Sequence, residues 1–293
     1  MHHHRASELE INAARAPTLY LMSAANRFVV IGNPVAHSLS PEIHARFGRQ
    51  LGIDLDYGTL FAPLDDFVGT TRAFFSAGGR GANVTVPFKV EALQLAHSRS
   101  ERAQLAGAAN VLTARNGALE AENTDGAGLV ADLTSNLGVE MRGARVLILG
   151  AGGAARGVVA PLLSLSPAAV VIANRTVERA LELAQRFAPL GPVSAAALDS
   201  IEGAFNLVLN ATSTSTRGQP LDLAAPCLAP RAWVYDMAYG PAARPFLETA
   251  RAMGARTSDG LGMLVEQAAE AFRIWHGTRP HTAQVLAELR TRR

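Results

Sequence analysis

Short apolar runs alternate with amphipathic stretches along this chain, a pattern typical of an α/β protein. The clearest unit covers residues 145–176, where an apolar run at 146–149 precedes a glycine-rich turn at 150–155. A helical pattern follows at residues 158–165, and a second apolar run occupies 170–172. Because a strand buried on both faces is apolar throughout, we predict a strand–turn–helix–strand unit of a parallel sheet.

The same pattern divides the rest of the chain into further elements. Strands are predicted at residues 27–31, 55–61, 81–87, 111–113, 205–210 and 233–236, and helices at 42–51, 64–77, 89–97, 125–137, 177–187, 245–253, 263–276 and 282–290. In the strand that Pro87 ends, Asn83 and Thr85 lie on one side and Val84 and Val86 on the other. The apolar side is expected to face the core, which leaves Asn83 and Thr85 for a ligand.

Length and composition indicate a two-domain soluble protein. A chain of 293 residues can bury two modest cores. Its net charge of +2, without a basic tract, argues against nucleic acid as a partner. The uncharged stretch 157–173 contains Pro161 and Pro167, so we predict no membrane span. The single cysteine, Cys227, excludes an intrachain disulfide and suits a cytoplasmic location.

The glycine-rich turn has the context of a dinucleotide-binding motif, since it lies between a strand and a helix. Glycines there allow a tight turn and bring backbone N–H groups against a pyrophosphate. The next strand ends in Asn174, Arg175 and Thr176, with Arg179 one turn later. NAD-binding proteins usually place a carboxylate at this point, whereas arginine forks suit a 2′-phosphate. NADP is therefore favoured over NAD.

Lys89 is the single lysine among 27 basic residues, all the others being arginine. A lysine can transfer its proton near neutral pH, whereas arginine cannot. Lys89 is therefore a candidate catalytic residue. Ser38 and Ser40 precede a helix, where two hydroxyls at a positive helix end can hold a carboxylate. Ser40 is also expected to be the helix N-cap, followed by Pro41.

Two further features are interpreted from local pattern. Thr124 or Asp125 is the expected cap of the helix that begins there, and Gln267 lies on an apolar stripe of its helix, where its amide needs a partner.

His37 and His44 are interpreted as structural. Residues 1–22 begin with three histidines after Met1 and are interpreted as a tag or disordered extension, with Met22 as a plausible start.

Nine segments, in order, carry a resemblance to a known family: GNPVAHSLSPEIH, NVTVPFK, AGAAN, ENTDG, GAGGAARG, NRT, NATS, YDMAY and DGLGMLVEQAA. The chain resembles the shikimate dehydrogenases, NADP-dependent enzymes that interconvert 3-dehydroshikimate and shikimate. The resemblance covers residues 28–276 and implies an α/β substrate domain and a Rossmann-type nucleotide domain with a cleft between them. It implies the division 23–124 (substrate domain), 125–260 (nucleotide domain) and 261–293 (helices returning to the substrate domain), with hinges at 123–126 and 259–262.

The resemblance also assigns roles. It implies Lys89 and Asp125 as the catalytic pair, with the substrate bound by Ser38, Ser40, Asn83, Thr85, Asn110, Asp125, Tyr239 and Gln267. It implies that NADP is bound by Gly150, Ala151, Gly152, Gly153, Ala154, Asn174, Arg175, Thr176, Arg179, Thr212, Met237 and Gly260. No metal is implied.

Several alternatives stay open. A dehydrogenase that also accepts quinate is compatible with Ser38 and Thr85, and a non-catalytic metabolite sensor is compatible with the fold. The sensor would be expected to lose Lys89 or Asp125. Oligomeric state is not determined, and a homodimer is one compatible state. The triplet Thr214-Ser215-Thr216 departs from the family, which usually has a glycine there.

Overall fold

The computed structural model describes residues 26–215, 218, 221 and 227–292. The expectation for residues 1–22 and the family departure at Thr216 lie outside these residues. In the part of the chain that is described, no helix has both the length and the apolar character needed to cross a membrane.

The first sheet is mixed and has the strand order β2-β1-β3-β5-β6-β4. Strands β1, β2 and β3 are parallel, whereas β5 is antiparallel to both β3 and β6. Its strands are β1 (Arg27–Gly32), β2 (Asp56–Phe61), β3 (Gly81–Val84), β4 (Ser98–Arg99), β5 (Val111–Arg115) and β6 (Ala118–Glu122). Its helices are α1 (Ser40–Leu51), α2 (Phe67–Ser76), α3 (Lys89–Leu95) and α4 (Glu101–Ala106).

The second sheet is parallel throughout, in the order β12-β11-β10-β7-β8-β9. Its elements are β7 (Arg145–Leu149), α6 (Gly153–Leu163), β8 (Ala169–Asn174), α7 (Val177–Phe187), β9 (Val193–Ala197), β10 (Phe205–Asn210), β11 (Leu228–Asp236), α8 (Arg244–Ala252) and β12 (Arg256–Asp259). This is the doubly wound arrangement, whose strand order reverses between β7 and β10. Ligands of such sheets bind at the carboxyl ends of the strands at this point.

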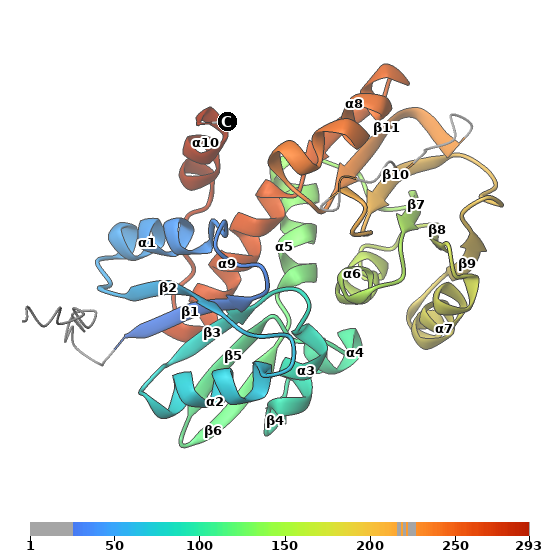
Figure 1. Ribbon diagram of the computed structural model, residues 1–293. Coiled ribbons are helices and arrows are strands. Elements are labelled where there is room, and N and C mark those ends of the chain that lie inside the picture. The colour runs from blue at the N-terminus through green and yellow to red at the C-terminus, as the bar shows by residue number, and fades with distance from the viewer. Residues whose placement is uncertain (1–25, 216–217, 219–220, 222–226, 293) are drawn as a thin grey trace, which may run out of the picture.

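Two helices lie between the sheets, α5 (Asp125–Ala131) and α9 (Leu261–His276), as Figure 1 shows. A Cβ on Gly128 of α5 would lie 2.7 Å from the Cβ of Gln267 on α9. A Cβ on Gly126 would lie 2.5 Å from the carbonyl oxygen of Gly157 on α6. The two glycines therefore let α5 approach a helix on either side, where any larger residue would force a shift.

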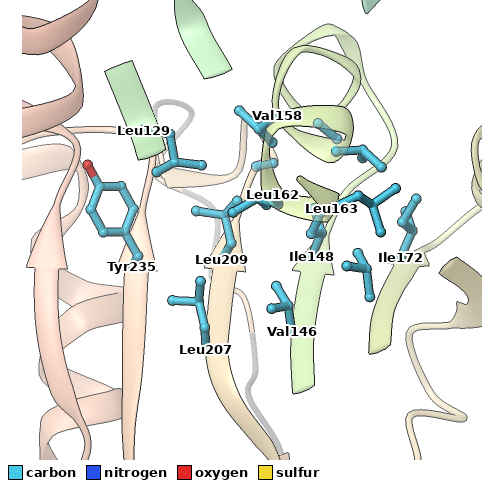
Figure 2. Close-up of a cluster of buried hydrophobic side chains, with 14 of the residues drawn as sticks. Leu129, Val146, Ile148, Val158, Leu162, Leu163, Ile172, Leu207, Leu209 and Tyr235 are labelled. Carbon is cyan, nitrogen blue, oxygen red and sulfur yellow. The ribbon is translucent and has the colours of Figure 1, made fainter. Parts of the chain in front are cut away.

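The core of the second sheet also receives side chains from α5. Figure 2 shows Leu129 beside Leu209 and Tyr235, with Val158 and Leu162 of α6 over the neighbouring strands. Full burial of one leucine stabilises the fold by about 1.5–3 kcal/mol. A separate cluster packs α1 against α9 and α10 (Ala283–Thr291). These contacts connect α5 and α9 to both halves of the molecule.

The architecture confirms the predicted α/β class, with differences at element ends. The strand predicted to reach Pro87 stops at Val84, because the amide of Phe88 donates to the carbonyl of Thr85 at 3.1 Å and turns the chain. The helix predicted over 125–137 is α-helical to Ala131, and residues Asp132–Asn136 continue it as a π-helical turn. Helix α4 and strands β4, β9 and β12 were not predicted; all four are short, between two and six residues.

Neither of the two predicted caps closes its helix with a side chain. Helix α1 starts at Ser40 itself, and its amide donates to the hydroxyl oxygen of Ser38 at 3.2 Å. At α5, Thr124 occupies the N-cap position, but its side chain bonds to Asn110 instead of capping. The amide of Asp125 donates to Asn123 Oδ1 at 3.0 Å. In both cases a side chain two residues earlier accepts from the first helical amide.

Candidate active site

The central feature is an ion pair between two helix starts. The Nζ of Lys89, the first residue of α3, lies 2.7 Å from Oδ2 of Asp125, the first residue of α5. The Asp125 side chain is 2% exposed and that of Lys89 is 20% exposed. The carboxylate is therefore buried in the protein, while the lysine side chain keeps some exposed surface.

Asn110 holds the second carboxylate oxygen. Its Nδ2 lies 2.9 Å from Asp125 Oδ1, 3.0 Å from Thr124 Oγ1 and 3.0 Å from Gln267 Oε1. Its own Oδ1 accepts from the amide of Thr124 at 2.8 Å. Since Nδ2 carries two hydrogens, three acceptors compete for them. Asn110 thus brings the start of α5 and the middle of α9 to one point.

The backbone fixes the ion pair from the lysine side as well. The amide of Ala109, the residue before Asn110, donates to the carbonyl oxygen of Lys89 at 2.8 Å. The amide of Asn110 donates to the carbonyl of Glu122 at 3.1 Å on the adjacent strand β6. The turn between α4 and β5 therefore positions Lys89 relative to Asp125.

Asn83 extends this network across the first sheet. Its Nδ2 donates to the carbonyl oxygen of Asn110 at 3.2 Å, and its Oδ1 accepts from the hydroxyl of Tyr57 at 2.6 Å. Ser38 and Ser40 lie at the start of α1, where Ser38 Oγ donates to Ser40 Oγ at 3.2 Å. Thr85 follows β3, and its amide donates to the carbonyl of Ile31 on β1 at 2.9 Å.

The predicted nucleotide turn lies at the carboxyl end of β7. Gly150 has φ 105°, and a Cβ there would lie 3.1 Å from the backbone of Ala211. At Gly152 and Gly153, which begin α6, a Cβ would meet nothing within 4 Å. No side chain caps this helix, so its first amides remain for a ligand. The turn therefore fits a pyrophosphate in shape and in hydrogen-bond donors.

The residues predicted to bind the adenosine end of the cofactor lie on the second sheet, at the end of β8 and the start of α7, whereas Lys89 lies beside the first sheet. Asn174 Nδ2 donates to the carbonyl of Thr176 at 2.8 Å, which fixes the turn. Arg175, Thr176 and Arg179 are at least partly exposed. Neither arginine forms an ion pair with any other residue that the structure describes. Two guanidinium groups without an acidic partner at this strand end fit a 2′-phosphate.

A buried carboxylate that the sequence analysis did not identify orders the loops beside the turn. Asp236, at the end of β11, accepts from Asn210 at 3.0 Å, from Ser215 at 2.6 Å and from the amide of Ala238 at 2.8 Å. Burial raises its pKa, which these hydrogen bonds oppose. Asn210 in turn accepts from the hydroxyl of Thr212 at 2.7 Å.

Three predicted residues lie where the two halves meet. Met237 packs against the core of the second sheet, whereas Tyr239 packs against the cluster of α1 and α9. The amide of Gly260 donates to the carbonyl of Ala238 at 2.9 Å, and a Cβ on Gly260 would lie 2.3 Å from the carbonyl oxygen of Met237. A glycine is therefore required for this close approach.

Other features lie outside this network. Two surface hollows of about 400 and 330 Å³ lie along β11, α8 and β12, and neither is lined by Lys89 or Asp125. Within residues 26–215, 218, 221 and 227–292, no three His, Cys, Asp or Glu side chains gather so that they could hold a metal ion. Tyr57, Asn210 and Asp236 are the residues that the sequence analysis missed; their positions on strands were the available signal.

Comparison with known protein families gives consistent matches along the chain. A model of the shikimate dehydrogenase substrate-binding domain matches residues 30–112, and a model of shikimate/quinate 5-dehydrogenase matches residues 132–220. A model of the shikimate 5′-dehydrogenase C-terminal domain matches residues 260–290.

Individual proteins are similar over most of their length. The NADP(+) shikimate dehydrogenase of Dechloromonas aromatica is 53% identical over 267 residues, covering 90% of this chain and 97% of that protein. The one from Janthinobacterium sp. is 51% identical over 265 residues, with the same coverage.

Two solved structures are similar to this chain in fold and in sequence. The Ael1 enzyme from Pseudomonas putida has a TM-score of 0.85 at 46% identity and covers 90% of this chain and 98% of its own. Shikimate 5-dehydrogenase from Thermus thermophilus, in complex with NADP(H) and shikimate, has a TM-score of 0.81 at 35% identity, covering 91% and 99%.

Proposed function

This chain belongs to the shikimate dehydrogenase family. We propose that Lys89 and Asp125 are the catalytic pair responsible for proton transfer in the reversible reduction of 3-dehydroshikimate to shikimate. The enzyme is an NADP-dependent oxidoreductase acting on a CH–OH group. The 2.7 Å ion pair, with the Asp125 side chain buried and the Lys89 side chain partly exposed, is the observation that carries the proposal.

NADPH, when bound, supplies the hydride that reaches the carbonyl carbon. The carbonyl oxygen then gains negative charge and needs a proton. Lys89 Nζ carries three hydrogens, of which one is directed to Asp125, so another can be donated to this oxygen. Positioned proton transfer of this kind contributes about 10²–10⁴ in rate. In the oxidation direction the same step runs in reverse, and the neutral amine that this donation leaves on Lys89 takes the proton of the shikimate hydroxyl.

The remaining polar side chains orient the substrate. Ser38 and Ser40 bind its carboxylate, and its oxygens are bound by Asn83, Thr85, Asn110, Asp125, Tyr239 and Gln267. Asn83, Asn110, Asp125 and Gln267 already contact one another through the Asn110 side chain and carbonyl. Because their relative positions are set before binding, little freedom remains to be lost in the transition state.

The residues of the second sheet hold NADP. Gly150, Ala151, Gly152, Gly153 and Ala154 accommodate the pyrophosphate at the start of α6, and Asn174, Arg175, Thr176 and Arg179 bind the 2′-phosphate. Thr212, Met237 and Gly260 would line the nicotinamide end of the cofactor site. The open space around Gly152 and Gly153 and the two arginines without acidic partners support this assignment.

Initial rates of shikimate oxidation with NADP⁺ and with NAD⁺ test the function, with quinate as the alternative substrate. We expect turnover with shikimate and NADP⁺ that collapses in a folded Lys89→Ala variant. Comparable turnover of quinate would assign a broader specificity. Saturable shikimate binding without turnover would assign a metabolite sensor instead.

We propose three further properties: a domain division, a location and an oligomeric state. The substrate domain comprises residues 23–124 and 261–293 and the nucleotide domain residues 125–260, with hinges at 123–126 and 259–262; the separate sheets on either side of residue 125 support this division. The location is cytoplasmic, which the free, buried Cys227 supports. A homodimer in solution is tested by light scattering at several concentrations.

A further inference from the structure

We propose that Tyr57 is a positioning residue of the substrate site, which fixes the orientation of the Asn83 amide. Tyr57 lies on β2, the edge strand next to β1, and neither its spacing nor the family resemblance assigned it a role. This inference rests on the proposed function, because Asn83 acts on the substrate of that function.

The orientation of the Asn83 amide follows from its two neighbours. A backbone carbonyl can only accept, so the group 3.2 Å from the carbonyl of Asn110 must be Nδ2. Oδ1 therefore faces Tyr57, whose hydroxyl must donate to it at 2.6 Å. The phenol of Tyr57 thus determines that the Oδ1 end of the Asn83 amide faces Tyr57 and that its Nδ2 end faces the carbonyl of Asn110.

The hydrogen bond from Tyr57 connects to the network around the ion pair. Tyr57 donates to Asn83, and Asn83 donates to the carbonyl oxygen of Asn110, whose side chain reaches Asp125. Tyr57, on the edge strand, is therefore linked through Asn83 to the residues around the reacting carbon.

The ring of Tyr57 is held against a rigid surface. It stacks on the imidazole of His44, with centroids 4.2 Å apart and planes 7° apart. Trp275 lies beside both rings, with its centroid 6.3 Å from that of Tyr57. Desolvation holds the pKa of Tyr57 well above its usual range, so the hydroxyl keeps its proton. The donor to Asn83 is consequently both fixed in place and always protonated.

This arrangement decides what Asn83 offers to a ligand. Oδ1 accepts from Tyr57, and one Nδ2 hydrogen is directed to the carbonyl of Asn110. The second Nδ2 hydrogen is the one that a substrate oxygen can accept. Without the phenol hydroxyl, Oδ1 loses this donor and the orientation of the amide is no longer enforced from both sides.

Steady-state kinetics of Tyr57→Phe test the inference, because the variant keeps the stacked ring and removes the hydroxyl. We expect KM for shikimate to rise about tenfold, the effect of one hydrogen bond, with kcat and KM for NADP⁺ little changed. Thr113→Val is the matched control. It removes a buried hydroxyl that accepts from Trp275 at 3.1 Å, in the same aromatic cluster but outside the hydrogen bonds of Asn83, and should leave KM unchanged.

A double-mutant cycle with Asn83→Ala separates positioning from general loosening. If Tyr57 acts through Asn83, Tyr57→Phe has no further effect on shikimate affinity in the Asn83→Ala background. Calorimetric Kd values replace KM where turnover is too slow. Additive effects, or an unchanged KM in Tyr57→Phe, would overturn the inference while wild-type turnover stands. Absence of shikimate turnover in the wild type would instead reject the proposed function.

Discussion

The ammonium of Lys89 lies 2.7 Å from the buried carboxylate of Asp125, although the two residues are 36 positions apart. Each is the first residue of a helix, Lys89 of α3 and Asp125 of α5. Asn110 secures the other oxygen of Asp125 at 2.9 Å. The lysine therefore has a fixed partner, and its remaining hydrogens are directed by geometry.

Replacing Lys89 with arginine keeps the positive charge but exchanges the amine for a guanidinium, which is not deprotonated in proteins. For Lys89→Arg we expect kcat for shikimate oxidation to fall by about 10²–10⁴, while NADP⁺ still binds. Steady-state rate measurements check the fall in kcat, and calorimetric titration with NADP⁺ checks that the variant still binds the cofactor. Near wild-type turnover in Lys89→Arg would show that charge alone suffices, and Lys89 would then be an electrostatic anchor.

Replacing Asp125 with asparagine keeps the shape of the side chain and removes its charge. Asp125→Asn should lower kcat by at least about tenfold, because Lys89 loses the anion that orients it and a hydrogen bond to a charged group contributes about 1.5–3 kcal/mol. Rates and thermal unfolding are measured together. A variant that is folded and fully active would exclude Asp125 from the catalytic pair.

Arg175 and Arg179 are expected to select NADP over NAD. Arg175→Ala and Arg179→Ala should each raise KM for NADP⁺ about tenfold, since a charge-assisted hydrogen bond is lost, and leave KM for NAD⁺ unchanged. Arg186→Ala is the matched control on α7, because its guanidinium binds the carbonyl of Gln104 instead. Equal changes for both cofactors would contradict a 2′-phosphate site.

The buried His44 side chain is expected to make the stability of the fold depend on pH. It is 0% exposed, and burial, with a smaller contribution from His276, lowers its pKa to about 3, an effect that the neighbouring Asn83 side chain opposes. Neither ring nitrogen has a partner at full hydrogen-bond geometry among the described residues. As pH falls from about 6.5 toward 3, the unfolded chain binds a proton that the folded chain does not, so stability decreases.

The substitution His44→Phe removes this contribution and keeps an aromatic ring in the stack. Urea unfolding between about pH 7 and pH 4 should show a shallower loss of stability for the variant than for the wild type. Glu270, whose pKa Arg273 and its neighbours lower to about 2, contributes equally to both proteins. Parallel curves for the two proteins would mean that His44 does not drive the dependence.

The close contact between α5 and α9 leaves little room for a larger residue at Gly128. Gly128→Ala should destabilise the fold by about 1–3 kcal/mol, because the added Cβ lies 2.7 Å from Gln267 and overpacking outweighs the better helix propensity of alanine. KM for shikimate should rise as Gln267 is displaced. Gly58→Ala, where a Cβ meets nothing within 4 Å, is the control in chemical denaturation.

Local pattern predicted most of the elements because the strands and longer helices carry strong apolar periodicity. The glycine turn at residues 150–155 was recognised for the same reason, since its strand and helix are adjacent in sequence. Element ends were predicted less well. Thr85 leaves its strand through a hydrogen bond to Phe88, and Ser40 lies inside α1 because Ser38 accepts from its amide. Such bonds depend on backbone conformation, which residue type alone does not specify.

The sequence by itself determined the α/β class, the family, the cofactor type and Lys89 as the exceptional basic residue. These follow from periodicity, composition and motifs that are local in the chain. The tertiary structure alone decided that Asn110 joins Asp125 to Gln267, that Tyr57 orients Asn83, and that Asp236 holds the loop of Thr212. These contacts join residues far apart in sequence, and each exists because sheet register and close helix packing bring polar groups within hydrogen-bond distance.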